Sequence, residues 1–257
     1  MTAQIPRILS SLAVAAMAAA CGGSFSEIPI ETPLRPKLDV SGFESILVAG
    51  FIAGGTDDVD GNLETTRLLR SQLRNQSDMR IVDSDVLPLI EVAIESRTIS
   101  DTSTEREDPL APEPILADED LAQYEHLFAN VDYWKQIGEE YQQPLIVTGT
   151  VMFASQDRSG TVQRDQEVYD SFGRRSVVPV RTYLERTGFV LRPRFIFIDG
   201  RTGAVLYSEN FREEVLYNAN QTSPALSSYF ELMDRLLPSF LSTLSTQTIR
   251  GTRVLLQ

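Results

Sequence analysis

Two kinds of hydrophobic pattern occur along this chain, and each predicts a different element. Continuous apolar runs at residues 45–51 and 145–153 are typical of strands that are buried on both faces of a sheet. From Asn62 onward, leucines recur at helical spacing while arginines lie elsewhere, which predicts an amphipathic helix capped by Asp60 or Asn62. Strands and helices therefore alternate in the first part of the chain.

The later pattern adds a meander. Further strands are predicted at 79–82 and in two extended segments, 177–198 and 204–216, with a hairpin turn at 199–203. Further helices are predicted at 84–95, at 118–141 with a break near Asn130, and at 223–244. Polar residues 156–175 are expected to separate the run at 145–153 from the extended segments, and a short strand at 253–256 is compatible with the pattern. This order predicts a single α/β (α+β) domain over residues 43–257, with a mixed sheet, helices packed on it and a late antiparallel hairpin.

The first 20 residues form a separate segment. Arg7 precedes a run of about 13 small or apolar residues, which is typical of a signal peptide and shorter than the roughly 20 residues of a membrane-spanning helix. Residues 1–20 are therefore predicted to be removed.

The only cysteine, Cys21, directly follows three alanines, and this junction resembles the lipobox of bacterial lipoproteins. The resemblance implies cleavage before Cys21, a diacylglycerol on its thiol and an acyl chain such as palmitate on its new amino group. The family usually has Leu where Ala18 stands. Because Gly22 follows the cysteine and no Asp does, the resemblance implies the outer membrane. The alternative is a soluble secreted protein with a chance cysteine near its cleavage site.

Two segments lack the periodicity of a packed element. Residues 21–42 contain Gly, Ser and several prolines, which predicts a flexible tether that carries the lipid and spans roughly 50 Å when fifteen residues are extended. Residues 97–118 are rich in Ser, Thr, Asp and Glu, which predicts an acidic solvated loop. A segment that orders on binding is the alternative for this loop.

Composition and charge exclude several classes of function. The formal net charge of -13 disfavours nucleic-acid partners, because binding to phosphates needs clustered Lys and Arg. One cysteine makes no internal disulfide, and one histidine does not supply a His-rich metal site. No cofactor, metal, catalytic residue or small-molecule substrate is therefore predicted.

The acidic loop after the first apolar run is a candidate ligand site with a simpler interpretation. Gly54 and Gly55 stand where phosphate-binding loops occur, but the carboxylates of Asp57, Asp58 and Asp60 would repel a phosphate. An EF-hand count places an arginine where a bidentate Glu is required, so calcium does not fit either. A cap at the N-terminus of the following helix is favoured.

His126 and Trp134 are the remaining candidates for chemistry or recognition. His126 lies on a predicted helix, without a nucleophile motif or a second histidine motif, which favours a surface or half-buried structural histidine over a general base. Trp134 has helical spacing to apolar residues, which favours core packing over a partner anchor. The long extended pair favours a soluble hairpin over a membrane hairpin, because arginines interrupt both of its faces.

Three elements together resemble a family. The strand at 46–51, the strand at 145–151 with a TGxV motif, and the hairpin at 195–208 with a DxxTGxVL motif resemble bacterial periplasmic lipoproteins related to the curli-secretion protein CsgG, the peptidoglycan-synthase activator LpoB and the TolB amino-terminal domain. The resemblance covers about residues 43–244. It implies a non-enzymatic α/β domain that faces the periplasm on a lipid anchor and binds envelope proteins or self-assembles. We therefore expect an adaptor, regulator or assembly component of a cell-envelope complex, with a subunit of a CsgG-like outer-membrane secretion channel as the alternative.

Overall fold

The structure, a computed structural model, describes residues 25–100, 114–218, 221 and 223–256. The described residues form two units: a globular unit within residues 37–245, and a smaller unit to which residues 25–36 and 246–256 contribute.

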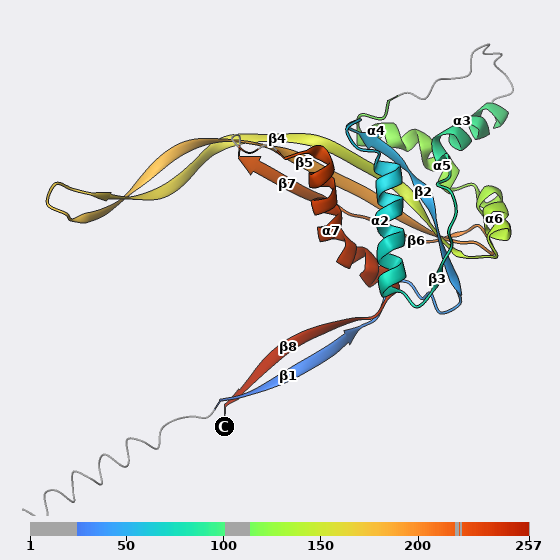
Figure 1. The fold of residues 1–257 in the computed structure, drawn as a ribbon, viewed down its shortest axis with the longest axis horizontal. Helices are drawn as coiled ribbons and strands as arrows, with labels where there is room; N and C mark the ends of the chain where they lie inside the picture. The colour runs from blue at the N-terminus through green and yellow to red at the C-terminus, as the bar shows by residue number, and fades with distance from the viewer. Residues whose placement is uncertain (1–24, 101–113, 219–220, 222, 257) are drawn as a thin grey trace, which may run out of the picture. The chain divides into compact units, whose positions relative to one another are not determined.

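The globular unit contains nearly all of the secondary structure (Figure 1). Its strands are β2 (Ser45–Gly55), β3 (Arg80–Ile81), β4 (Leu145–Tyr169), β5 (Arg175–Asp199), β6 (Val205–Asn210) and β7 (Glu213–Asn218). Its helices are α2 (Gly61–Gln76), α3 (Leu89–Ser100), α4 (Asp118–Leu121), the 3-10 turn η1 (Ala122–Tyr124), α5 (Glu125–Phe128), α6 (Val131–Glu140) and α7 (Ala225–Leu244).

A mixed sheet organises this unit. The strand order is β3-β2-β4-β5-β6, and β7 also pairs with β5. β2 runs parallel to β3 and β4, whereas β4, β5, β6 and β7 pair in antiparallel fashion. The predicted fold class is confirmed, because the crossovers come first and the antiparallel meander follows.

Helices cover both faces of the sheet, which explains the continuous apolar runs. In β2, Ile46 and Val48 pack into one core with α2 and α7, while Leu47 and Ala49 pack into a second core with α3, α5 and α6. Successive side chains of a strand point to opposite faces, so a strand between two helical layers needs apolar residues at every position.

The outer edge of β2 is closed by residues that are not in a strand. The register of β2 against β4 shifts at a bulge between Val48 and Gly50, and Gly50 has a φ of 137°, which favours glycine. Asn62 of α2 accepts the Phe51 N–H at 2.7 Å, and Arg70 donates to the Val48 carbonyl at 2.7 Å. These bonds satisfy an edge that would otherwise be open to another strand.

Several predicted boundaries were wrong. The helix expected at 84–95 begins only at Leu89, because Leu87 donates its N–H to the Ala49 carbonyl and extends the cover of β2. The polar residues 156–175, expected to separate two strands, instead continue β4 as far as Tyr169 and start β5 at Arg175. Backbone pairing between β4 and β5 holds this segment in strand form without an apolar core.

The smaller unit was not expected. β1 (Phe25–Leu34) lies within the segment predicted to be a flexible tether, and it pairs with β8 (Gln247–Leu256) in an antiparallel ribbon. The terminal strand is therefore longer than the 253–256 segment suggested by its apolar residues. The prediction that residues 21–42 lack regular structure was wrong for β1.

Candidate interaction surface

The long hairpin of β4 and β5 extends beyond the rest of the sheet (Figure 1). The pairing of β2 with β4 ends at Phe153, and the pairing of β7 with β5 covers only Arg186–Leu191. From residue 159 to residue 185, among the described residues, the two strands pair only with each other. We call residues 159–185 the arm.

One face of the arm carries an apolar stripe. The register pairs Arg164 with Val180 and Gln166 with Val178, so even-numbered residues of both strands share a face. The apolar members of this face are Val162, Val168, Val178, Val180 and Leu184. Val168 and Val178 are exposed and the other three are half-buried. The opposite face carries charged side chains and tyrosines, but Val177 also lies there and is 52% exposed, and Arg164 lies on the face of the stripe. The apolar residues are therefore concentrated on one face without being confined to it.

The tip of the arm is a tight turn stabilised by one carboxylate. Asp170 accepts hydrogen bonds from the backbone N–H groups of Phe172 and Arg174, both at 2.9 Å, and from Arg174 Nε at 2.8 Å. The bonds from Arg174 hold the pKa of Asp170 below its usual value. The Phe172 ring is 82% exposed and lies 5.5 Å from the Arg174 guanidinium carbon. The tip therefore presents an aromatic ring and a cation to solvent.

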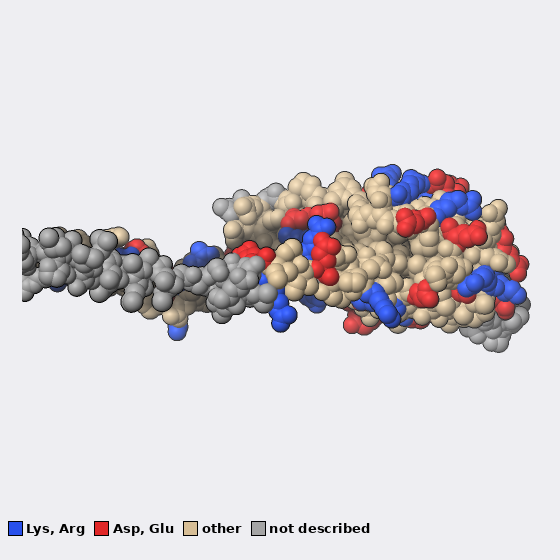
Figure 2. All heavy atoms as spheres, turned by 90° about the horizontal axis from the view of Figure 1, so that it is seen from below, with Lys and Arg blue, Asp and Glu red and all other residues tan. Residues whose placement is uncertain are grey.

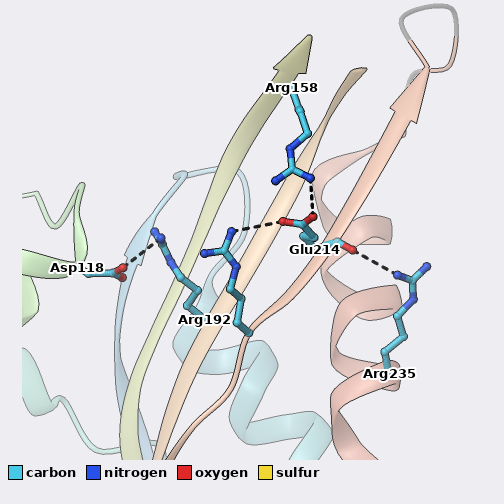
Figure 3. Close-up of polar contacts among 6 residues, drawn as sticks. Asp118, Arg158, Arg192, Glu214 and Arg235 are labelled. Atoms are coloured by element: carbon cyan, nitrogen blue, oxygen red, sulfur yellow. Dashed lines mark hydrogen bonds and ion pairs between the residues drawn. The ribbon is translucent and has the colours of Figure 1, made fainter. Parts of the chain in front are cut away.

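Ion pairs surround the base of the arm (Figure 3). Glu214 of β7 accepts from Arg158 of β4 at 3.2 Å and from Arg212 at 3.3 Å, while its carbonyl accepts from Arg235 of α7 at 3.4 Å. On the other side of β5, Arg192 pairs with Asp118 of α4 at 3.1 Å. Exposed pairs of this kind contribute about 0–1 kcal/mol each, so they orient side chains more than they stabilise the fold.

The hairpin is the most basic part of an acidic chain. Residues 156–194 contain eight arginines and five Asp or Glu, a net charge of +3, whereas the whole chain carries -13. On the face shown in Figure 2, acidic and basic side chains are interspersed, and the excess of acid forms no single large patch. Positive charge is therefore concentrated in one part of the sequence, the hairpin, while the rest of the chain carries the excess of acid.

The acidic loop after β2 borders a cavity of about 660 Å³. The described residues that line it include Asp57 and Asp60 but no Lys or Arg, and Leu63, Leu87 and Ile115 are among its apolar members. Asp60 accepts the Leu63 N–H at 2.9 Å, so of the two predicted caps of α2, Asp60 and Asn62, the cap is Asp60. Among the described residues, no group of three potential metal ligands occurs.

His126 and Trp134 both have structural contacts. The Nε2 atom of His126 lies 3.0 Å from the Ala93 carbonyl and 3.0 Å from the Ser96 hydroxyl, so this half-buried side chain joins α3 to α5. Trp134 is fully buried and donates from Nε1 to the Leu127 carbonyl at 2.9 Å. The expectation of a half-buried histidine and a core tryptophan is confirmed.

Two predicted features lie wholly or partly outside the described residues. Cys21 and the signal peptide are outside them, so lipidation stays a prediction. The predicted acidic loop at 97–118 is described only at its ends. There, α3 continues to Ser100, and Ile115 is buried and accepts the Gly55 N–H at 2.8 Å. Ile115 is therefore packed, which the expectation of a solvated loop did not foresee.

The arm itself was missed as a functional feature. Its sequence is polar and only weakly alternating, whereas the segment from Asp170 to Arg174, with Gly173 at a φ of 75°, has the composition of a hairpin turn. Recognising this turn would have joined the apolar run at 145–153 and the extended segment at 177–198 into one hairpin.

Comparison with known proteins gives only distant similarity. No family model matches the chain, and no curated protein matches it by sequence. Lipoprotein GNA1162 from Neisseria meningitidis is similar at 11% identity, with 77% of this chain and 97% of that chain covered and a TM-score of 0.32. The LpoB C-terminal domain from Salmonella enterica is similar at 9% identity, with 78% and 91% covered and a TM-score of 0.26. A putative neuraminyllactose-binding hemagglutinin homolog from Helicobacter pylori is similar at 7% identity, with 81% and 86% covered and a TM-score of 0.35.

Among the described residues, no helix is both long enough and apolar enough to cross a bilayer.

Proposed function

We propose that the mature chain is an outer-membrane lipoprotein, anchored through lipid on Cys21, whose periplasmic domain is a non-enzymatic adaptor or regulator of a cell-envelope complex. The observation that carries the adaptor role is the arm, an exposed hairpin with an apolar stripe on one face. The anchor rests on the signal-peptide pattern and the three alanines before Cys21.

The arm supports a binding role because its apolar stripe is exposed to solvent, which is unfavourable for a two-stranded hairpin. Two-stranded ribbons are marginal in water unless a third strand or a helix covers an apolar face. Among the described residues, no element covers the stripe that contains Val178 and Val168. Exposed apolar surface of this kind marks interaction sites in folded proteins. A partner that covers the stripe would supply the missing packing.

The charge of the hairpin indicates the chemistry of the partner. Its eight arginines favour an acidic protein surface, because complementary charge speeds association and excludes basic competitors. The arginine pairs at the base, such as Arg158 with Glu214, are half-exposed and free to exchange partners at little cost.

The anchor is tested by fractionation. Cys21→Ala should leave the protein outside the membrane fraction, and Ser24→Ala, three residues later, should leave it in the membrane. Several acyl chains, at about 0.8 kcal/mol per buried methylene, make the anchored form essentially permanent. Retention of Cys21→Ala in the membrane fraction would refute the anchor.

The arm is tested by photo-crosslinking in intact cells. Benzoylphenylalanine at Val178 on the apolar stripe should give adducts with another envelope protein, and the same group at Gln163 on the opposite face should give few. Both positions lie on the arm and are exposed, so they differ only in face. Equal yields at the two positions, or none at either, would remove the arm as the binding surface.

A second candidate is a subunit of an oligomeric export channel related to CsgG. It is favoured by the free edges of both arm strands, which are available to neighbouring copies. Arg164 weighs against it, because it lies on the same face as the apolar stripe, and the lipid-facing side of a membrane hairpin is apolar. Detergent-extracted protein that migrates as a monomer, without rings in electron micrographs, would eliminate this candidate.

A further inference from the structure

The two ends of the described chain form a two-stranded ribbon. β1 and β8 pair over ten positions, from Phe25 opposite Leu256 to Leu34 opposite Gln247. The pairing brings the first described residue next to the last one. Two-stranded ribbons of this kind need cover on an apolar face to be stable in water.

The ribbon is amphipathic. Ile28, Ile30 and Leu34 share one face and are 44%, 40% and 46% exposed. The opposite face carries Glu31, which pairs with Arg250 at 3.0 Å across the ribbon. Alternate positions of a strand point to opposite faces, so Ile28 and Ile30 are neighbours on this face, and Thr32 separates them from Leu34.

The outer edge of β1 is poorly suited to another strand. Pro29 and Pro33 lie four register positions apart in β1, and neither has an N–H to donate. Proline is tolerated at these two positions because the N–H that it lacks would point away from β8. The part of this ribbon that is available for binding is therefore its apolar face and not the edge of β1.

We propose that this apolar face lies on the lipid surface, so that the ribbon is a second membrane-contacting element beside the lipid anchor. The inference rests on the proposed lipidation of Cys21. Cys21 precedes Phe25 by four residues, which span at most about 14 Å when extended. The end of the ribbon that contains Phe25 and Leu256 is therefore held close to the headgroups.

The chemistry of the face favours lipid over a second copy of the ribbon. Arg253 lies on the same face, opposite Ile28, and is exposed. Packing two such faces together would bury two arginines among isoleucines, at a high cost in desolvation. A headgroup layer instead offers phosphates to the guanidinium while the isoleucines reach the acyl chains.

The consequence concerns the reach of the protein. A flexible tether would allow a wide range of distances from the membrane, whereas a ribbon on the surface removes that freedom. The globular unit begins at Lys37, three residues after β1 ends at Leu34. Its attachment point therefore stays near the lipid surface, and its partners are those that approach the membrane.

The test uses the full lipidated chain reconstituted in vesicles of phosphatidylethanolamine and phosphatidylglycerol. Once Cys21 is acylated, an introduced cysteine is the only free thiol, because the chain has one cysteine. Ile30→Cys and the control Thr252→Cys place the fluorophore NBD on opposite faces, at adjacent register pairs. At position 30 we expect blue-shifted emission that brominated lipids quench, and at position 252 an aqueous spectrum without quenching.

Each other result overturns the inference in a recognisable way. Aqueous spectra at both positions mean that the ribbon stands off the lipid. A blue shift at position 30 without quenching by brominated lipid means that protein, such as a second copy, covers the face. A parent chain that accepts the label at Cys21 and does not bind vesicles refutes the lipid anchor itself, and the ribbon inference falls with it.

Discussion

The two halves of β4 and β5 differ in environment although their backbone pairing is the same. Near Leu145 and Asp199 the strands are buried on both faces, and along the arm the same strands are mostly exposed. The antiparallel register continues through both halves without interruption. Backbone hydrogen bonds therefore determine how far the hairpin extends, and side-chain burial determines which half is stable by itself.

The largest expected contrast is in hydrogen exchange. Amides of residues 145–153 should exchange only through global unfolding, at about 5–15 kcal/mol for a domain of this kind, while amides of the arm should open locally at far lower cost. Exchange followed by mass spectrometry on the detergent-solubilised protein measures both. Equal protection in the two halves would mean that something already covers the arm.

Aromatic truncations on β5 should show the same contrast. Phe197 is buried and packs against Phe240, so Phe197→Ala should lower the free energy of unfolding by about 3–5 kcal/mol. Tyr183 lies on the arm and is exposed, so Tyr183→Ala should change it by less than about 0.5 kcal/mol. Urea titration measures both variants. A large loss at Tyr183 would mean that its side chain is packed in the folded protein.

Two aspartates allow a smaller comparison: Asp199 ends β5, and Asp170 lies in the turn between β4 and β5. Asp199, which is 7% exposed, accepts three bonds from Arg201 at 2.9 Å, and those bonds hold its pKa below the usual value. Asp199→Asn should lower the free energy of unfolding by about 1–2 kcal/mol at neutral pH. Asp170→Asn, at the exposed tip of the arm, should lower it by less than Asp199→Asn does.

The pH dependence of these variants follows from the direction of the shift. A lowered folded-state pKa stabilises the protein above the unfolded value of about 3.9, and that contribution is lost as pH falls through the folded value. The stability difference between the parent and Asp199→Asn should therefore shrink below about pH 4. A difference that persists unchanged in acid would show that packing, and not charge, is responsible.

A substitution on the apolar stripe should change the stability least and should still weaken binding of the partner. Val178→Ser on the apolar stripe should alter the unfolding free energy by less than about 0.5 kcal/mol, because the side chain is exposed. It should nevertheless reduce adducts from a crosslinker placed at Leu184. Gln163→Ser, on the other face, is the matched control. Unchanged adducts in Val178→Ser would argue against the stripe as the contact.

Local sequence signals predicted the core of the globular unit well. The apolar runs at 45–51 and 145–153, the cap at Asp60, the break at Asn130 and the final helix all have short-range causes. Each depends on residues a few positions apart, which periodicity and capping preferences detect. The candidate site was less predictable, because the arm is polar and its exposure depends on where neighbouring strands end.

The sequence by itself determined the signal-peptide pattern, the position of Cys21, the α/β fold class and the helices that bury one face. Only the tertiary structure decided that residues 156–175 extend two strands, and that β1 pairs with β8 from the other end of the chain. The physical reason is that backbone N–H and C=O groups are the same in every residue except proline. Pairing between distant segments therefore leaves little trace in side-chain pattern until the strands lie side by side.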